Sequence, residues 1–173
     1  MEGAAERADS LKDLQAGTRR AYRRSVALGG FVTVEARLGL LRDRVFEGGE
    51  ELPVRRGRGG WREVVGPTGT GRVRYDGWRD RILIESAAGN LLIPFRWRNT
   101  TFTWQGRMYR IATGFWSRLK IFDGEREAAG GKVTLAGFRF EFVVPELRAI
   151  ERELAIGLGL RAQAFAAVMA VAH

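Results

Sequence analysis

Apolar and polar residues alternate along most of the chain from residue 31 onward, in short runs separated by glycine-rich turns. The run Phe31–Arg37 alternates as a half-buried strand does, and Ile82–Glu85, Thr100–Trp104 and Phe138–Val144 are later runs of the same kind. The dipeptide Asp76-Gly77 is typical of a tight turn between two strands. About eleven such runs predict a mainly β protein, with the strands arranged as a barrel or a sandwich.

The pattern becomes helical after Pro145, a residue that suits the first turn of a helix. Between residues 154 and 172, only Arg161 and Gln163 are strongly polar. A helix that is apolar on all sides must be surrounded by protein or by lipid. The segment is rich in glycine and alanine, which allow other backbones to approach closely. We therefore expect a helix enclosed by a closed antiparallel β-barrel.

A membrane anchor is the alternative interpretation of the same C-terminal segment, because nineteen residues from 154 to 172 are just long enough to span a bilayer. Arg161 lies near the middle of the segment, where a charge costs about 3 kcal/mol. The many small residues also make the segment weakly hydrophobic for insertion. Burial within the protein is the favoured prediction, and a tail-anchored membrane protein stays open as an alternative.

The N-terminal residues differ in pattern from the rest. Residues 4–28 are predicted to form a helix, capped by Asp9 or Ser10 and ending at Gly29-Gly30. The expected organisation is a helical extension over residues 1–30 and a β domain over residues 31–173. The first ten residues carry acids and lack an apolar core, so no secretory signal is predicted and a cytoplasmic location is expected.

Composition excludes several classes of chemistry. The chain has no cysteine, so disulfide scaffolds, thiolate metal sites and cysteine nucleophiles are absent, and its one histidine is the terminal His173. No set of nucleophile, base and orienting residue can be assembled from the sequence. We therefore expect no enzymatic activity, no cofactor and no metal site.

The positive charge is unevenly distributed. The formal net charge is +9, and residues 55–120 hold 14 basic residues against 4 acidic ones, an excess of 10 that accounts for the whole net charge. A basic field confined to one part of a fold favours an anionic partner such as nucleic acid, a lipid head group or an acidic protein.

Many of these arginines are spaced two residues apart within predicted strands, which places both on the same face of a sheet. Guanidinium groups bind phosphate oxygens through paired hydrogen bonds. A second basic element is the glycine-rich stretch from residue 55 to residue 60. The predicted anion-binding residues are Arg55, Arg56, Arg58, Arg72, Arg74, Arg79, Arg81, Arg96 and Arg98, and Arg118 with Lys120 forms a further pair of the same spacing. The five tryptophans are expected in the core.

Four segments resemble strands of the tubby C-terminal-like superfamily, which includes tubby domains, phospholipid scramblases and the plant LURP-one-related proteins. They are Trp104–Tyr109, Arg118–Gly124, Lys132–Ala136 and Phe138–Val143. The resemblance covers about residues 31–172 and implies a closed barrel around a central hydrophobic helix. Tubby domains bind phosphoinositides and scramblases are associated with membranes and calcium, but no stretch here matches their binding motifs residue by residue.

The sequence as a whole predicts a non-enzymatic binding or scaffold domain for an anionic partner. Acidic phospholipid at the inner membrane face is the leading candidate, with peripheral contact through the arginines. A nucleic-acid-binding β-barrel, an acidic protein partner, a tail-anchored membrane protein and a domain without a ligand are the alternatives.

Overall fold

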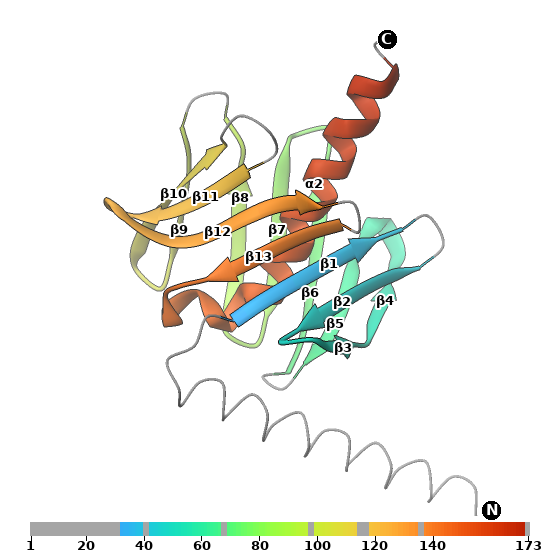
Figure 1. The fold of residues 1–173 in the computed structure, drawn as a ribbon, viewed down its shortest axis with the longest axis horizontal. Coiled ribbons are helices and arrows are strands. Elements are labelled where there is room, and N and C mark those ends of the chain that lie inside the picture. The colour runs from blue at the N-terminus through green and yellow to red at the C-terminus, as the bar shows by residue number, and fades with distance from the viewer. Residues whose placement is uncertain are drawn as a thin grey trace, which may run out of the picture.

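The computed structural model describes residues 32–39, 42–66, 69–96, 99–113, 118–134 and 137–171. Within them the chain forms thirteen β-strands and one long C-terminal helix, so the predicted mainly β class with an apolar C-terminal helix is confirmed (Figure 1). The helix predicted over residues 4–28 and the domain boundary at residue 30 lie outside the described residues.

The strands form two antiparallel sheets. Sheet A has the spatial order β3 (Glu50–Leu52), β2 (Asp43–Glu47), β1 (Val32–Leu38), β13 (Gly137–Phe142), β12 (Arg126–Thr134), β11 (Arg118–Asp123), β10 (Arg107–Thr113) and β9 (Thr100–Trp104). Sheet B has the order β4 (Val54–Arg56), β5 (Arg62–Gly66), β6 (Gly69–Asp76), β7 (Arg81–Ser86) and β8 (Gly89–Pro94). Nearly every connection within a sheet is a hairpin, which explains the short, closely spaced runs of the sequence.

The prediction of a closed barrel is wrong for the hydrogen-bonded strands, because the described ladders end at β3 and β9 in sheet A and at β4 and β8 in sheet B. The reason at one seam is the position of Pro53. It is the only residue between β3 and β4, so these two strands follow each other end to end and do not pair side by side. At the other seam β8 ends at Pro94 and β9 begins at Thr100, in the other sheet.

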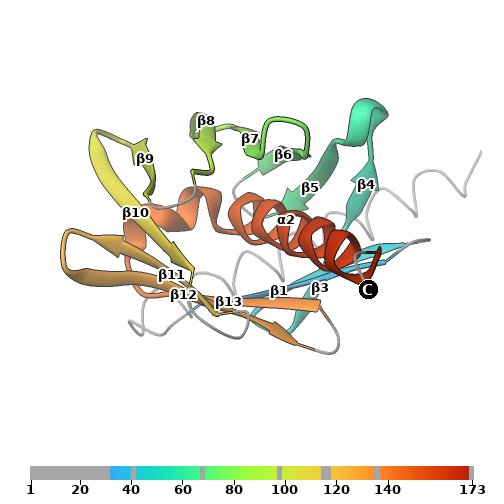
Figure 2. The same cartoon turned by 90° about the horizontal axis from the view of Figure 1, so that it is seen from above.

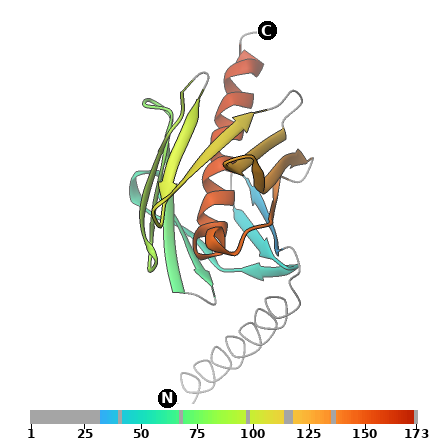
Figure 3. The same cartoon turned by 90° about the vertical axis from the view of Figure 1, so that its left-hand side faces the viewer.

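The C-terminal helix lies between the two sheets (Figures 2 and 3). A 3₁₀ segment, η2 (Pro145–Ile150), leads into α2 (Glu151–Val171). The first ten residues of α2 are almost entirely buried, and Leu154 and Ile156 have no exposed surface. Gly157 permits a close approach to sheet B, since a Cβ there would lie 2.6 Å from Ile82 Cγ2. The predicted use of small residues on this helix is therefore confirmed at Gly157.

The second half of α2 extends beyond the sheets (Figure 3). Phe165 is 50% exposed and Val168 is 67% exposed, so the expectation of a helix buried as far as residue 172 is wrong from about Arg161 onward. The physical reason is the length of the strands. β1 ends at Leu38, whose carbonyl oxygen accepts a hydrogen bond from Gln163, so the helix residues after Gln163 extend past the end of this strand. Within the described residues, neither α2 nor η2 has the length and apolar character needed to cross a bilayer.

Candidate functional site

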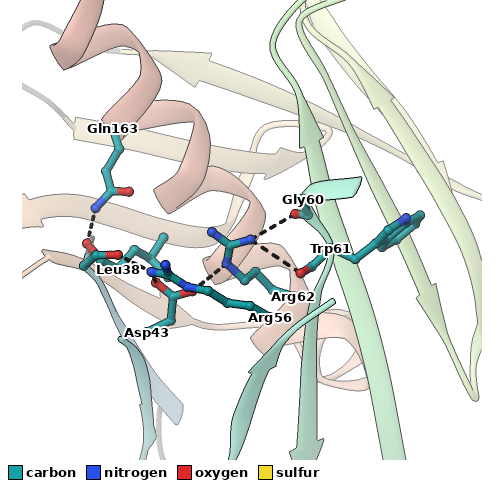
Figure 4. Close-up of polar contacts among 8 residues, drawn as sticks. Leu38, Asp43, Arg56, Gly60, Trp61, Arg62 and Gln163 are labelled. Carbon is teal, nitrogen blue, oxygen red and sulfur yellow. Dashed lines mark hydrogen bonds and ion pairs between the residues drawn. The ribbon is translucent and has the colours of Figure 1, made fainter. Parts of the chain in front are cut away.

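The C-terminal end of α2 marks one end of the molecule, where four described or partly described connections between strands meet. They are residues 39–42, 57–61, 77–80 and 95–99. Two contacts fix this placement: Arg161 binds Asp80, and the Gln163 side-chain amide donates a hydrogen bond to the Leu38 carbonyl oxygen (Figure 4). We call the described residues of these connections, with Arg118 at the start of β11, the rim.

The rim carries exposed arginines. Arg58, Arg79, Arg96 and Arg118 are exposed, and none of the ion pairs between described residues involves their side chains. Arg42 is also exposed, and its pair with Glu51 has an N–O distance of 3.3 Å. Arg58, Arg79 and Arg96 belong to the residues predicted to bind anions, so the structure brings three of those nine to one end of the molecule.

Three carboxylates at this end, Asp43, Asp76 and Asp80, are bound to arginines, and Asp43 is the most buried of them. Arg56 Nε donates to Asp43 Oδ2 at 2.8 Å, and Arg62 Nε donates to the same oxygen at 2.5 Å (Figure 4). Burial raises the pKa of Asp43, but the hydrogen bonds and positive charges of Arg56 and Arg62 outweigh burial and lower it overall. Since Asp43 is on β2 and its partners are on β4 and β5, this cluster joins sheet A to sheet B.

Asp80 is bound in a similar way. Arg161 Nε and Nη2 donate to its two carboxylate oxygens at 2.8 and 2.9 Å, and the Tyr75 hydroxyl donates to Oδ1 at 2.9 Å. Burial raises the pKa of Asp80, while the hydrogen bonds from Arg161 and Tyr75 lower it by more. Burial, followed by the bond to Asp80, raises the pKa of Tyr75 to about 12. Asp76 is likewise paired with Arg81, at 3.0 Å, so positive charge predominates on the described rim.

Exposed apolar side chains accompany these arginines. Trp78, in the turn between β6 and β7, is 96% exposed, and Phe165 and Val168 are exposed on the projecting half of α2. The expectation that the tryptophans lie in the core is therefore wrong for Trp78, although Trp104 is buried as expected. The signal that places Trp78 at the surface is the turn dipeptide Asp76-Gly77 directly before it.

The paired arginines of the strands lie on the outer faces, as their spacing predicts. Arg72 and Arg74 point outward from β6 while Val73 between them is fully buried. Their guanidinium carbons lie 4.8 and 5.5 Å from the centre of the Trp61 ring, and Arg72 also pairs with Glu85 at 2.5 Å. These two arginines therefore form a wall on sheet B that adjoins the rim at Trp61.

The remaining residues that were predicted to bind anions differ in their surroundings. Arg55 is exposed on β4. Arg56 and Arg81 are engaged with Asp43 and Asp76, so they stabilise the fold before any ligand is considered. Arg79 and Arg81 do not share a strand face, because Arg79 lies in the turn and β7 begins at Arg81. Arg98 lies outside the described residues.

A different cluster lies at the opposite end of the molecule, where α2 begins. Glu151 and Glu153 are each 1% exposed. Burial, and then the adjacent Glu47 carboxyl, raise the pKa of Glu151 to about 10. Among the described residues there is no group of three or more acidic or histidine side chains that could hold a metal ion.

Comparisons with known proteins supply no identification: no family model matches the chain, and no curated protein or solved structure matches it either. The resemblance to the tubby-like superfamily therefore stays a prediction.

Proposed function

We propose that this domain binds membrane surfaces that contain anionic phospholipid, with the rim facing the lipid. The observation that carries the proposal is the combination, at one end of the molecule, of exposed arginines that form no ion pair with any described residue and a tryptophan that is 96% exposed. Arginine forks bind phosphate oxygens, and tryptophan is favoured at the level of lipid head groups. The exposed Phe165 and Val168 add apolar surface at the same end.

Charge separation along the molecule supports this orientation. The carboxylates Asp43, Asp76 and Asp80 near the rim are each neutralised by an arginine. The opposite end has the exposed Glu50 at the start of β3 and the exposed Glu125 in the turn between β11 and β12. A negatively charged surface therefore attracts the rim and orients the domain before contact.

Co-sedimentation with vesicles tests the proposal. Neutral phosphatidylcholine vesicles are compared with vesicles that also contain phosphatidylserine, at low and high salt. We expect pelleting with the anionic vesicles alone and less of it at high salt, because a basic residue near such a surface contributes about 1 kcal/mol and salt screens this attraction. Protein that stays in the supernatant with both vesicles, or pellets equally with both, contradicts the proposal.

Two matched pairs of variants locate the contact. Arg79→Glu on the rim should weaken binding to anionic vesicles by about tenfold or more. Arg126→Glu makes the same charge change at an exposed position beside the opposite end and should have much less effect. Trp78→Ala should weaken binding, whereas Met108→Ala, which removes another exposed apolar side chain away from the rim, should not. Equal losses within either pair would show that the rim is not the contact.

A further inference from the structure

A cavity of about 570 Å³ opens beside the rim, between the second half of α2 and the ends of β11, β12 and β13. Of the sixteen described residues that line it, eleven are apolar or glycine. Leu158 and Phe138 line it from the buried core, and Phe165 lines it from the projecting part of the helix. The cavity is thus an apolar space continuous with the exposed apolar surface of α2, and its volume is in the range of small-molecule sites.

Part of the helix side of the cavity is lined by small residues. Ala162 and Ala166 are four residues apart, so they lie on the same face of α2. Across the cavity, Leu119 and Val133 come from neighbouring strands of sheet A. Val133 is 44% exposed although its side chain is apolar, which places apolar surface near the opening of the cavity.

Positive charge stands beside this apolar space. Arg118 lines the cavity, is exposed, and takes part in none of the ion pairs between described residues. Lys132 lies directly opposite Arg118 in the β11–β12 ladder and is likewise exposed. Val133 lines the cavity, so the adjacent Lys132 points to the other face of sheet A and lines a different hollow. Arg118 is therefore the cation at the opening of the cavity. Arg161 also lines the cavity, but Asp80 neutralises it.

We propose that this cavity takes up a single acyl chain that carries an anionic head group. The chain occupies the apolar space between α2 and sheet A, and the head group binds Arg118 at the opening of the cavity. The inference rests on the proposed function for the lipid character of the ligand. It adds a cavity that binds one lipid molecule to the rim surface that contacts a membrane. The chain comes from a free fatty acid or from a single-chain phospholipid, since both have this chemistry.

Displacement of anilinonaphthalene sulfonate from the full-length protein, without vesicles, tests the inference. The probes are oleate, oleoyl lysophosphatidate and the uncharged methyl oleate, each below its critical micelle concentration. We expect oleate or oleoyl lysophosphatidate to displace the dye, and the stronger of the two identifies the source of the chain. Methyl oleate should bind at least tenfold more weakly than the better anion. Absence of displacement by either anion, or equal displacement by methyl oleate, overturns the proposal.

Neighbouring alanines on the exposed half of α2 provide a matched pair of variants. Ala166→Phe places a larger side chain in the cavity. It should weaken oleate binding by about tenfold, because the phenylalanine side chain takes up space that the acyl chain needs. Ala167→Phe adds the same side chain at an exposed position that does not line the cavity, so it should bind within about twofold of the unaltered protein. Equal binding by the two variants, with unchanged circular dichroism, contradicts the site.

A second variant tests the head-group contact. Arg118→Gln should weaken binding of the anions by about tenfold and leave that of methyl oleate unchanged, since a hydrogen bond to a charged group is stronger than a neutral one. Failure of the cavity is distinguishable from failure of the proposed function. If the protein pellets with anionic vesicles but binds no free acyl chain, only the acyl-chain site is contradicted. If it binds oleate but does not pellet with vesicles, only the membrane-binding proposal is contradicted.

Discussion

Arg161, where α2 leaves the sheets, binds Asp80 in the turn between β6 and β7 through two hydrogen bonds of 2.8 and 2.9 Å. The Arg161 guanidinium also lies over the Phe95 ring, with its carbon 3.9 Å from the ring centre. Asp80 has a positive φ of 42°, a conformation that aspartate tolerates better than most residues. The ion pair therefore fixes the turn that presents Trp78 and Arg79 at the rim.

Removing the charge of Asp80 should destabilise the protein in a pH-dependent way. Asp80→Asn should lower the free energy of unfolding by about 1–2 kcal/mol near neutral pH, a reduced value because both side chains keep some solvent contact. The pKa of Asp80 is lowered on folding, so its contribution is present above the unfolded value of 3.8 and is lost as the pH falls through the folded value. Urea titrations at about pH 7 and about pH 3 should show the difference shrinking in acid.

The control for this prediction is Asp123→Asn, which breaks the more exposed pair with Arg107 at the other end of sheet A. Asp123→Asn should lower the free energy of unfolding by less than about 1 kcal/mol. A cost for Asp80→Asn no larger than that of the control, or a cost that persists unchanged in acid, would contradict a structural role for the Asp80 charge.

Gly71 faces Glu153 across the core, and its missing side chain makes room for that carboxyl. A Cβ at Gly71 would lie 1.8 Å from Glu153 Oε1, and one at Gly66 would lie 1.3 Å from Arg152 Nη1. Both charged side chains are at most 2% exposed, so each would have to move within the core to admit a Cβ. Two glycines on neighbouring strands thus accommodate the buried start of α2.

Gly71→Ala should therefore lower the free energy of unfolding by about 1–3 kcal/mol, the usual cost of adding volume to a packed core. Gly77→Ala is the control, because a Cβ there meets only Tyr75 Cε1 at 3.5 Å and its φ is not positive. Thermal or urea unfolding measures both. Equal stability of the two variants would show that the core around Glu153 adjusts freely.

The sequence predicts the strands well because the alternation of each run depends on local residues. It predicts that Val73 and Leu119 face inward between basic residues, and both are buried. The buried start of α2 also follows from its apolar pattern. The point at which burial ends does not follow, because it depends on where β1 ends in the folded sheet, far away in the sequence.

The candidate site was only partly predictable for a similar reason. Arg56 and Arg58 belong to one basic stretch and look equivalent in the sequence. In the fold, Arg56 binds Asp43, thirteen residues away, while Arg58 remains exposed on the rim. Trp78 could have been placed at the surface from its turn, but the general preference of tryptophan for the core pointed the other way.

Glu151 makes the stability of the fold sensitive to alkaline pH. Its carboxyl is buried beside Glu47, with Arg152 and Arg148 nearby, and burial followed by the Glu47 carboxyl raises its pKa to about 10. A carboxyl whose pKa is raised on folding contributes most below the unfolded value of 4.5, and this contribution is lost as the pH rises toward the folded value.

Glu151→Gln, which keeps the shape and removes the titration, should therefore become more stable relative to the unaltered protein as the pH rises. The upper limit of the change is about 1.4 kcal/mol per pH unit for one proton. Urea titrations between about pH 5 and about pH 9 measure it, and Glu125→Gln, at an exposed turn residue, is the control that should show no such trend. A difference between Glu151→Gln and the unaltered protein that stays constant with pH would mean that Glu151 is ionised in the folded state, with Arg152 and Arg148 as its counter-ions.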